Sequence, residues 1–260
     1  INEVTVTDGN GCVDSFAVVI PADSADTVIA MGTDPLCAGV CDGTLFTSNT
    51  CTGCTFNWID SASNASVGTT DTVTGRCAGT YYVEMTNAGG CTSIDTVTLV
   101  DPIGVTVAIT SFDTVSCLGG NDGTATALAT GGSGTITYQW SNGNTGTVAT
   151  LLTAGTFTVY ATDANGCLDS AQVIITEPAT GLSVVASIDS NVSCNGANDG
   201  GASAVAAGGS GTLTYTWNGA LNGTPITGLT AGTYVVVVSD AGSCTATDSV
   251  TILEPTAVVG

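Results

Sequence analysis

Cysteine is the residue type in this sequence with the most evident chemistry, because two thiols can be oxidised to a disulfide. The 260-residue chain has 11 cysteines. Four of them end similar segments, such as "LTAGTFTVYATDANGC" and "LTAGTYVVVVSDAGSC", and we call them the closing cysteines: Cys12, Cys91, Cys167 and Cys244. Three others lie in "LCAGVCDGT", "SCLGGNDGT" and "SCNGANDGG", and we call them the opening cysteines: Cys37, Cys117 and Cys194.

The constant spacing of opening and closing cysteines predicts one disulfide per repeat. The expected pairs are Cys37–Cys91, Cys117–Cys167 and Cys194–Cys244, which lie 50 or 54 residues apart. A domain of about 77 residues buries a small core, and a disulfide typically contributes about 2–4 kcal/mol to its stability. Cys12 would then belong to a repeat whose opening cysteine lies upstream of this chain.

The first complete repeat contains four additional cysteines: Cys41, Cys51, Cys54 and Cys77. Cys51 and Cys54 occupy a hairpin turn where the later repeats have "GGSG", so a local Cys51–Cys54 disulfide is expected, and elimination leaves Cys41–Cys77. A Cys-x-x-Cys motif can also bind metal or act in redox chemistry, but no second motif accompanies it. So many cysteines favour disulfides and an oxidising, extracellular compartment.

The composition excludes several classes of function. The net charge is −21, Arg76 is the only cationic side chain, and histidine is absent. Nucleic-acid binding requires cations to neutralise phosphates, and catalysis by His or Lys is impossible. Segments such as "TDANGC" and "GNDG" supply two or three oxygen ligands, fewer than a calcium site needs, so they indicate Asx turns. We expect no metal site, no cofactor, no enzymatic activity, and no membrane insertion, because no apolar run is long enough.

The hydrophobic pattern has a period of two, which is typical of half-buried β-strands. "TITYQW" places Ile136, Tyr138 and Trp140 on one face, and "TLTYTW" does the same for Trp217. Clusters of Gly, Asn and Asp separate these runs as turns. Six or seven strands per repeat and no helix predict an all-β protein, a tandem array of small immunoglobulin-like β-sandwich repeats. The tryptophans are expected in the cores.

The repeats divide the chain into five parts. Residues 1–21 are read as the C-terminal end of a preceding repeat, 22–102 as the repeat with extra cysteines, 103–178 and 179–255 as two further repeats, and 256–260 as the start of the next. Each repeat ends on a pair such as Glu177-Pro178. No long spacer separates them, so neighbouring repeats of the same chain should abut and form a stiff array.

Taken together, the motifs Cys-x-Gly-x-Asn-Asp-Gly, Tyr-x-Trp, Ala-Gly-Thr-Tyr and Asn-Gly-Cys resemble the SprB-type repeat of Bacteroidota cell-surface proteins. The resemblance covers nearly all of the chain, although the first repeat departs from it at Cys41 and lacks "GGSG". It implies a segment of a large adhesin that is secreted by the type IX system, in some members mobile during gliding motility. The expected function is a non-enzymatic stalk or filament. The alternatives are an array of carbohydrate-binding modules and a subunit of a laterally assembled fibre, with surface polysaccharide or other filament chains as partners.

The resemblance also implies O-glycosylation at Asp-Ser/Thr followed by an apolar residue or Thr. The candidate acceptors are Ser24, Thr27, Ser61, Thr72, Thr96, Thr114, Ser170 and Ser249. Alternation along the last strand of each repeat predicts that Thr96, Ser170 and Ser249 point away from the core. The alternative is that each Asp-Ser/Thr pair simply opens a strand, with its hydroxyl solvated and unmodified.

Overall fold

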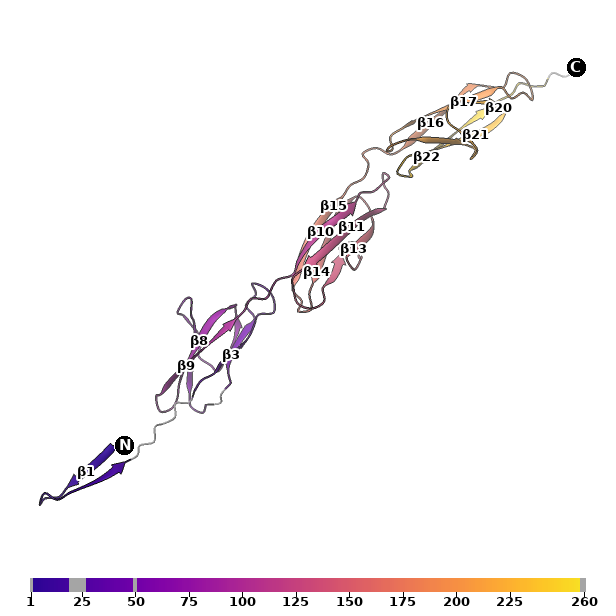
Figure 1. Ribbon diagram of the computed structural model, residues 1–260. Helices are drawn as coiled ribbons and strands as arrows, with labels where there is room; N and C mark the ends of the chain where they lie inside the picture. The colour runs from indigo at the N-terminus through magenta and orange to yellow at the C-terminus, as the bar shows by residue number, and fades with distance from the viewer. Residues whose placement is uncertain (1, 19–26, 49–50, 258–260) are drawn as a thin grey trace. The chain divides into compact units, whose positions relative to one another are not determined.

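The structure is a computed structural model that describes residues 2–18, 27–48 and 51–257. Every regular element in these residues is a β-strand, and the chain divides into two units, Ile1–Gly104 and Val105–Gly260 (Figure 1). In the described residues no helix has the length and apolar character needed to cross a membrane. The all-β prediction is therefore confirmed.

The first unit contains a hairpin and one β-sandwich. The hairpin pairs β1 (Asn2–Thr7) with β2 (Val13–Val18). One sheet of the sandwich has the order β3-β4-β7, with β3 at Ala30–Thr33, β4 at Gly43–Thr47 and β7 at Thr72–Arg76. The other has the order β6-β5-β8-β9, with β5 at Thr55–Asp60, β6 at Ser66–Gly68, β8 at Gly79–Thr86 and β9 at Thr92–Leu99.

The second unit contains two sandwiches of the same strand order, although the middle one has no strand in the place of β6. In the middle repeat one sheet has the order β10-β11-β13, with β10 at Thr106–Asp113, β11 at Gly123–Thr130 and β13 at Val148–Leu152. The other has the order β12-β14-β15, with β12 at Thr137–Trp140, β14 at Gly155–Thr162 and β15 at Leu168–Ile175. In the last repeat one sheet has the order β16-β17-β20, with β16 at Ser183–Ser190, β17 at Gly200–Ala207 and β20 at Ile226–Leu229. The other has the order β19-β18-β21-β22, with β18 at Thr214–Trp217, β19 at Leu221–Asn222, β21 at Gly232–Ser239 and β22 at Thr245–Ile252.

One tryptophan lies at the centre of each sandwich core. Trp58, Trp140 and Trp217 have exposed fractions of 0%, 1% and 0%. Each indole N–H donates to a backbone carbonyl 6 or 12 residues further along the chain, namely that of Thr70 (3.2 Å), Gly146 (3.0 Å) or Gly223 (3.1 Å). A buried tryptophan needs such a partner for its N–H, so the predicted core role of these residues is confirmed.

A tyrosine at the start of β8 and β21 shows the immunoglobulin-like character of the fold. The Tyr81 hydroxyl donates to the carbonyl of Cys77 at 2.9 Å, and the Tyr234 hydroxyl donates to that of Thr230 at 3.1 Å. This return to the backbone four residues upstream is the tyrosine corner of immunoglobulin-like sandwiches. The middle repeat has Phe157 at this position.

Side-chain acceptors on the last strand of each sandwich join it to the first strand. These two strands are edges of different sheets, and the edge N–H groups of the first strand would otherwise be open to other chains. Asp95 accepts the N–H of Ala30, and Asp248 accepts that of Ala186, each at 2.8 Å. Two residues earlier on the same face, Asp169 accepts the N–H of Val107 at 2.8 Å, and Ser93 accepts that of Val28 at 3.2 Å. We call these contacts the edge clasp.

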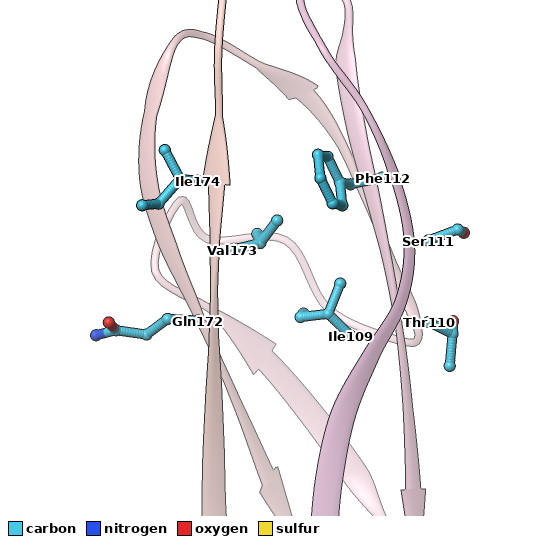
Figure 2. A pocket seen from close by; sticks show the side chains of 7 residues that line it. All are labelled: Ile109, Thr110, Ser111, Phe112, Gln172, Val173 and Ile174. Carbon is cyan, nitrogen blue, oxygen red and sulfur yellow. The ribbon is translucent and has the colours of Figure 1, made fainter.

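The clasp is incomplete in the middle repeat, where Ala171 stands at the position of Asp95 and Asp248. There the two edge strands leave a groove of about 660 Å³ lined by residues 109–112 and 172–174. Figure 2 shows Ile109, Phe112 and Val173 directed into the space between β10 and β15, while Gln172 points away. The groove therefore lies next to the missing clasp.

We predict that Ala171→Asp completes the clasp. The N–H of Ile109 faces the same way as that of Val107, because the two residues are two apart on one strand, and a carboxylate at 171 could accept it. Exchange of the Ile109 amide, measured by NMR, should slow by roughly tenfold, the effect of a hydrogen bond worth about 1.4 kcal/mol. The control is Ala171→Val, which fills space but offers no acceptor. Equal exchange rates in the two variants would contradict the role of the carboxylate.

Candidate functional site

The opening cysteine of the middle repeat lies in a short loop, residues 116–120, that two acidic side chains hold in place. Asp122 accepts the backbone N–H of Ser116 at 3.0 Å and also the Ser116 hydroxyl, which lowers the pKa of that carboxyl. Glu177, from the Glu-Pro pair that ends the repeat, accepts the N–H of Gly119. Because these contacts fix the backbone on both sides of Cys117, they set the position of its sulfur.

The same two clamps occur in the other repeats. The aspartate directly before β4 or β17 accepts the N–H of the residue that precedes the opening cysteine. Asp42 accepts that of Leu36 at 2.9 Å, and Asp199 accepts that of Ser193 at 3.0 Å. The acid before Pro accepts an N–H two residues after that cysteine: Asp101 from Gly39 at 2.9 Å and Glu254 from Gly196 at 2.8 Å. The acids of "NDG" and Glu-Pro thus have a structural role that the sequence pattern alone did not reveal.

The closing cysteine lies in a turn built on one aspartate or asparagine. Asp240 accepts the N–H of Cys244 at 2.9 Å through Oδ1 and the N–H of Ser210 at 2.8 Å through Oδ2. Asp163 makes the same contacts with Cys167 and Ser133. These are the Asx turns that the sequence predicts. Among the described residues, no group of three or more Cys, Asp or Glu side chains is arranged to hold a metal ion.

The first repeat replaces part of this arrangement with disulfides. Asn87 accepts the N–H of Cys91 at 2.9 Å, but its amide offers a single acceptor oxygen. The hairpin that Asp163 and Asp240 hold in the later repeats is here closed by the Cys51–Cys54 disulfide. A further disulfide joins Cys41 and Cys77, with the Cα atoms 3.9 Å apart. Both pairs are those that elimination predicts.

The pairing of the opening and closing cysteines differs from the prediction. Cys117 is bonded to Cys244, with a Cα–Cα distance of 5.6 Å, so the expected pairs Cys117–Cys167 and Cys194–Cys244 are wrong. The Cys37–Cys91 pair is wrong as well, because the Cys91 thiol is free. Cys37 and Cys167 each take part in a disulfide, and the free thiols among the described residues are those of Cys12, Cys91 and Cys194.

The length of the last strand explains this correction. Cys167 immediately precedes β15, while the opening loop of the same repeat lies at the far end of β15, where Val115 donates to the carbonyl of Thr176 at 2.9 Å. A strand of eight residues spans about 26 Å at about 3.3 Å per residue. Disulfide Cα atoms lie about 4.4–6.8 Å apart. The closing cysteine of a sandwich therefore cannot reach its own opening cysteine.

Close backbone contacts surround the Cys117–Cys244 bond. The Cys244 sulfur lies 3.3 Å from the carbonyl oxygen of Ser116. In the connection between β15 and β16, a Cβ added at Gly181 would lie 3.3 Å from the side chain of Leu118. A Cβ added at Gly208 would lie 2.1 Å from the carbonyl oxygen of Gly181. These glycines allow the opening loop of the middle repeat, the connection and the last repeat to approach closely.

The candidate glycosylation residues lie on the surface wherever the structure describes them. Seven are exposed: Thr27, Ser61, Thr72, Thr96, Thr114, Ser170 and Ser249. Ser24 lies outside the described residues. The outward orientation of Thr96, Ser170 and Ser249 agrees with the strand alternation, and their preceding aspartates form the edge clasp. Modification of these hydroxyls stays a prediction.

A family model for the SprB repeat matches two segments, residues 110–145 and 186–222. Each runs from the first strand of a sandwich through the opening cysteine to the strand that carries the core tryptophan. Parts of the middle and last repeats therefore match the SprB repeat. The matched segments contain the opening loops of the middle and last SprB repeats, with Cys117 and Cys194, and neither includes a closing cysteine.

None of the curated protein sequences matches this chain. Among solved structures, the N-terminal eight immunoglobulin domains of Down Syndrome Cell Adhesion Molecule are similar at 12% identity and a TM-score of 0.36, covering 94% of this chain and 39% of that one. A 1.5-MDa bacterial ice-binding adhesin is similar at 16% identity and a TM-score of 0.32, covering 88% and 98%. Fibronectin(III)-like modules of Clostridium thermocellum CbhA share 15% identity at a TM-score of 0.25, covering 57% and 95%.

We predict that the closing turn weakens in acid. The N–H of Ser210 is the largest cause that lowers the pKa of Asp240, and the N–H of Cys244 adds to it. A lowered folded-state pKa means that the carboxylate stabilises the turn above its ordinary pKa of about 4 and loses this effect as pH falls through the folded-state value. NMR protection factors of the Ser210 and Cys244 amides should therefore fall below about pH 4.

The matched variant is Asp240→Asn, which copies Asn87 of the first repeat. It keeps an acceptor for the N–H of Cys244 and removes the one for Ser210, so only the Ser210 amide should lose protection at neutral pH. Its remaining protection should not depend on the carboxyl titration. An acid response equal to that of the parent chain would show that another group is responsible.

Proposed function

We propose that this chain is a non-enzymatic structural segment of a cell-surface adhesin, a stiff stalk built of SprB repeats. The observation that carries the proposal is the Cys117–Cys244 disulfide, which joins one repeat to the next across their connection. The connection itself is short, since β15 ends at Ile175 and β16 begins at Ser183. A covalent brace across a short connection restricts bending, which suits a stalk.

An extracellular location is supported by the disulfides, because such bonds persist in oxidising compartments. The negative charge has almost no cationic counterpart, and it keeps the chain soluble and apart from neighbouring chains. The SprB match supports the finer expectations of Bacteroidota origin, type IX secretion and a place in gliding or adhesive filaments. Neighbouring repeats are the first partners in this proposal.

The carbohydrate-binding alternative loses its main support, because it needs exposed aromatic rings and the three tryptophans are buried. Its strongest remaining site is the groove beside Phe112, whose side chain is 51% exposed. We predict that the 260-residue chain does not bind glycans on an array of bacterial polysaccharides, and that an antibody to it labels intact cells of the producing bacterium. Binding that Phe112→Ala abolishes would instead favour the carbohydrate-binding module.

We also propose that the exposed hydroxyls of Thr96, Ser170 and Ser249 carry O-glycans in the native host. Each lies on the last strand of its sandwich, an edge strand of the sheet in which it pairs, and sugar there would hinder pairing between sheet edges of different chains. Peptide mass analysis of native material should show added hexose mass on these peptides. The same chain produced in a host without this modification is the control. Unmodified peptides from the native host would disprove the proposal.

A further inference from the structure

The opening loop of the last repeat has the same construction as that of the middle repeat but no partner cysteine. Asp199 and Glu254 clamp it as Asp122 and Glu177 clamp the loop of Cys117. The Cys194 thiol is exposed and free. Beside it lies a hollow of about 410 Å³ lined by Ser193, Cys194, Asn195, Pro255, Thr256 and Ala257.

The corresponding place in the middle repeat is occupied by the closing turn of the repeat that follows. There the Cys244 sulfur lies against the carbonyl of Ser116, the equivalent of Ser193, and a Cβ added at Gly242 would lie 3.4 Å from the same carbonyl. Two repeats of one chain thus show the same loop with and without a closing turn. The hollow at Cys194 has the location and the reactive group that this turn requires.

We propose that every opening loop is a socket for the closing turn of the following SprB repeat, and that Cys194 forms a disulfide with the closing cysteine of such a repeat. The state of the other cysteines agrees with this rule. Cys91 and Cys12 are free closing cysteines whose amides are already held by Asn87 and Asp8, so each presents a preformed turn.

The bond forms by thiol–disulfide exchange with a small disulfide oxidant such as oxidised glutathione. The Cys194 thiolate attacks one glutathione sulfur, forms a mixed disulfide and releases one glutathione thiolate. The closing-cysteine thiolate then attacks the Cys194 sulfur and releases the second. Two protein thiols are oxidised, two glutathione thiols are produced, and the two protein protons are passed to them.

The rule deepens the proposed stalk function, because bonds of this kind overlap along the chain. Cys194 lies between Cys117 and Cys244 in the sequence, so the loop that a Cys194 disulfide would close begins inside the loop that the Cys117–Cys244 disulfide closes. Under the rule every residue of the array lies inside a closed covalent loop, so no single break in the backbone can part it. With bonds inside each repeat, residues 168–193 would lie between loops and one cut there would separate the repeats.

The chain allows a direct test, because Arg76 is its only tryptic site. Arg76→Gln removes that site, and Thr180→Arg places a new one at an exposed residue in the connection between the middle and last repeats. After trypsin, we expect one full-length band on a non-reducing gel and two fragments after reduction. Adding Cys117→Ser should give two fragments without reductant. Release of residues 181–260 without reductant from the Arg76→Gln, Thr180→Arg variant that keeps Cys117 would overturn the observed pairing and the rule with it.

The socket at Cys194 is tested by extension. In the Arg76→Gln chain, residues 256–260 are replaced by a copy of residues 179–260, which reproduces the connection between the middle and last repeats, and Thr180→Arg in the copy provides the tryptic site. After oxidation with glutathione disulfide and cleavage, the appended repeat should stay attached until it is reduced, and Cys194→Ser should release it at once. Because Cys194 is free in the parent chain, this substitution removes no existing bond. An appended repeat that separates without reductant would refute the socket, whatever the chain binds on cells.

Discussion

The eight-residue strand that ends each sandwich is the constraint on which the rest of the structure depends. It runs from the closing cysteine at one end of the repeat to the acid-Pro pair and the opening loop at the other. A strand cannot be shortened without losing its pairing partners, so the two cysteines of one repeat stay about 26 Å apart. Cys244 instead meets an opening cysteine, Cys117, in the repeat before its own.

The carboxylates of this chain act mainly as acceptors for backbone N–H groups. With Arg76 as the only cation, ion pairs cannot neutralise them, and charge-assisted hydrogen bonds to the backbone take that place. Asp122 and Glu177 hold the opening loop, Asp240 the closing turn, and Asp248 the sheet edge. Geometry matters more than charge in some of these positions, since Asn87 and Ser93 perform similar contacts without a carboxylate.

Local patterns in the sequence were sufficient to predict the strands, the buried tryptophans and the Asx turns before the closing cysteines, but not the contacts of the aspartate in "NDG". Alternation decides which face of a strand is buried, and the three tryptophans share that face. The pairing of Cys117 could not be read from spacing, because a repeated sequence places a closing cysteine at a regular distance both in the same repeat and in the next. The count of eight strand residues after Cys167 was the available signal, since it separates the two ends of the repeat.

The roles of the acids and of the groove were also beyond pattern analysis. The Asp of "NDG" resembles any turn residue, and only the folded loop shows that it holds the amide before a cysteine. The groove beside Phe112 follows from Ala171 standing where the other repeats have aspartate. In the sequence Ala171 is only a small residue in the last strand of the repeat. The N–H group that an acceptor at this position binds lies more than 60 residues earlier, as the contact between Asp248 and Ala186 in the last repeat shows.

Pairing with the next repeat also changes how stability is distributed along the chain. The Cys117–Cys244 bond closes a loop of 127 residues rather than 50, which in the chain-entropy description adds roughly 0.8 kcal/mol of stabilisation per bond. More importantly, the bond belongs to two sandwiches, so each loses part of its support when the other unfolds. In arrays of repeats, such neighbour terms make unfolding cooperative. The disulfides of the first repeat, Cys41–Cys77 and Cys51–Cys54, act within one sandwich and stabilise it independently of its neighbours.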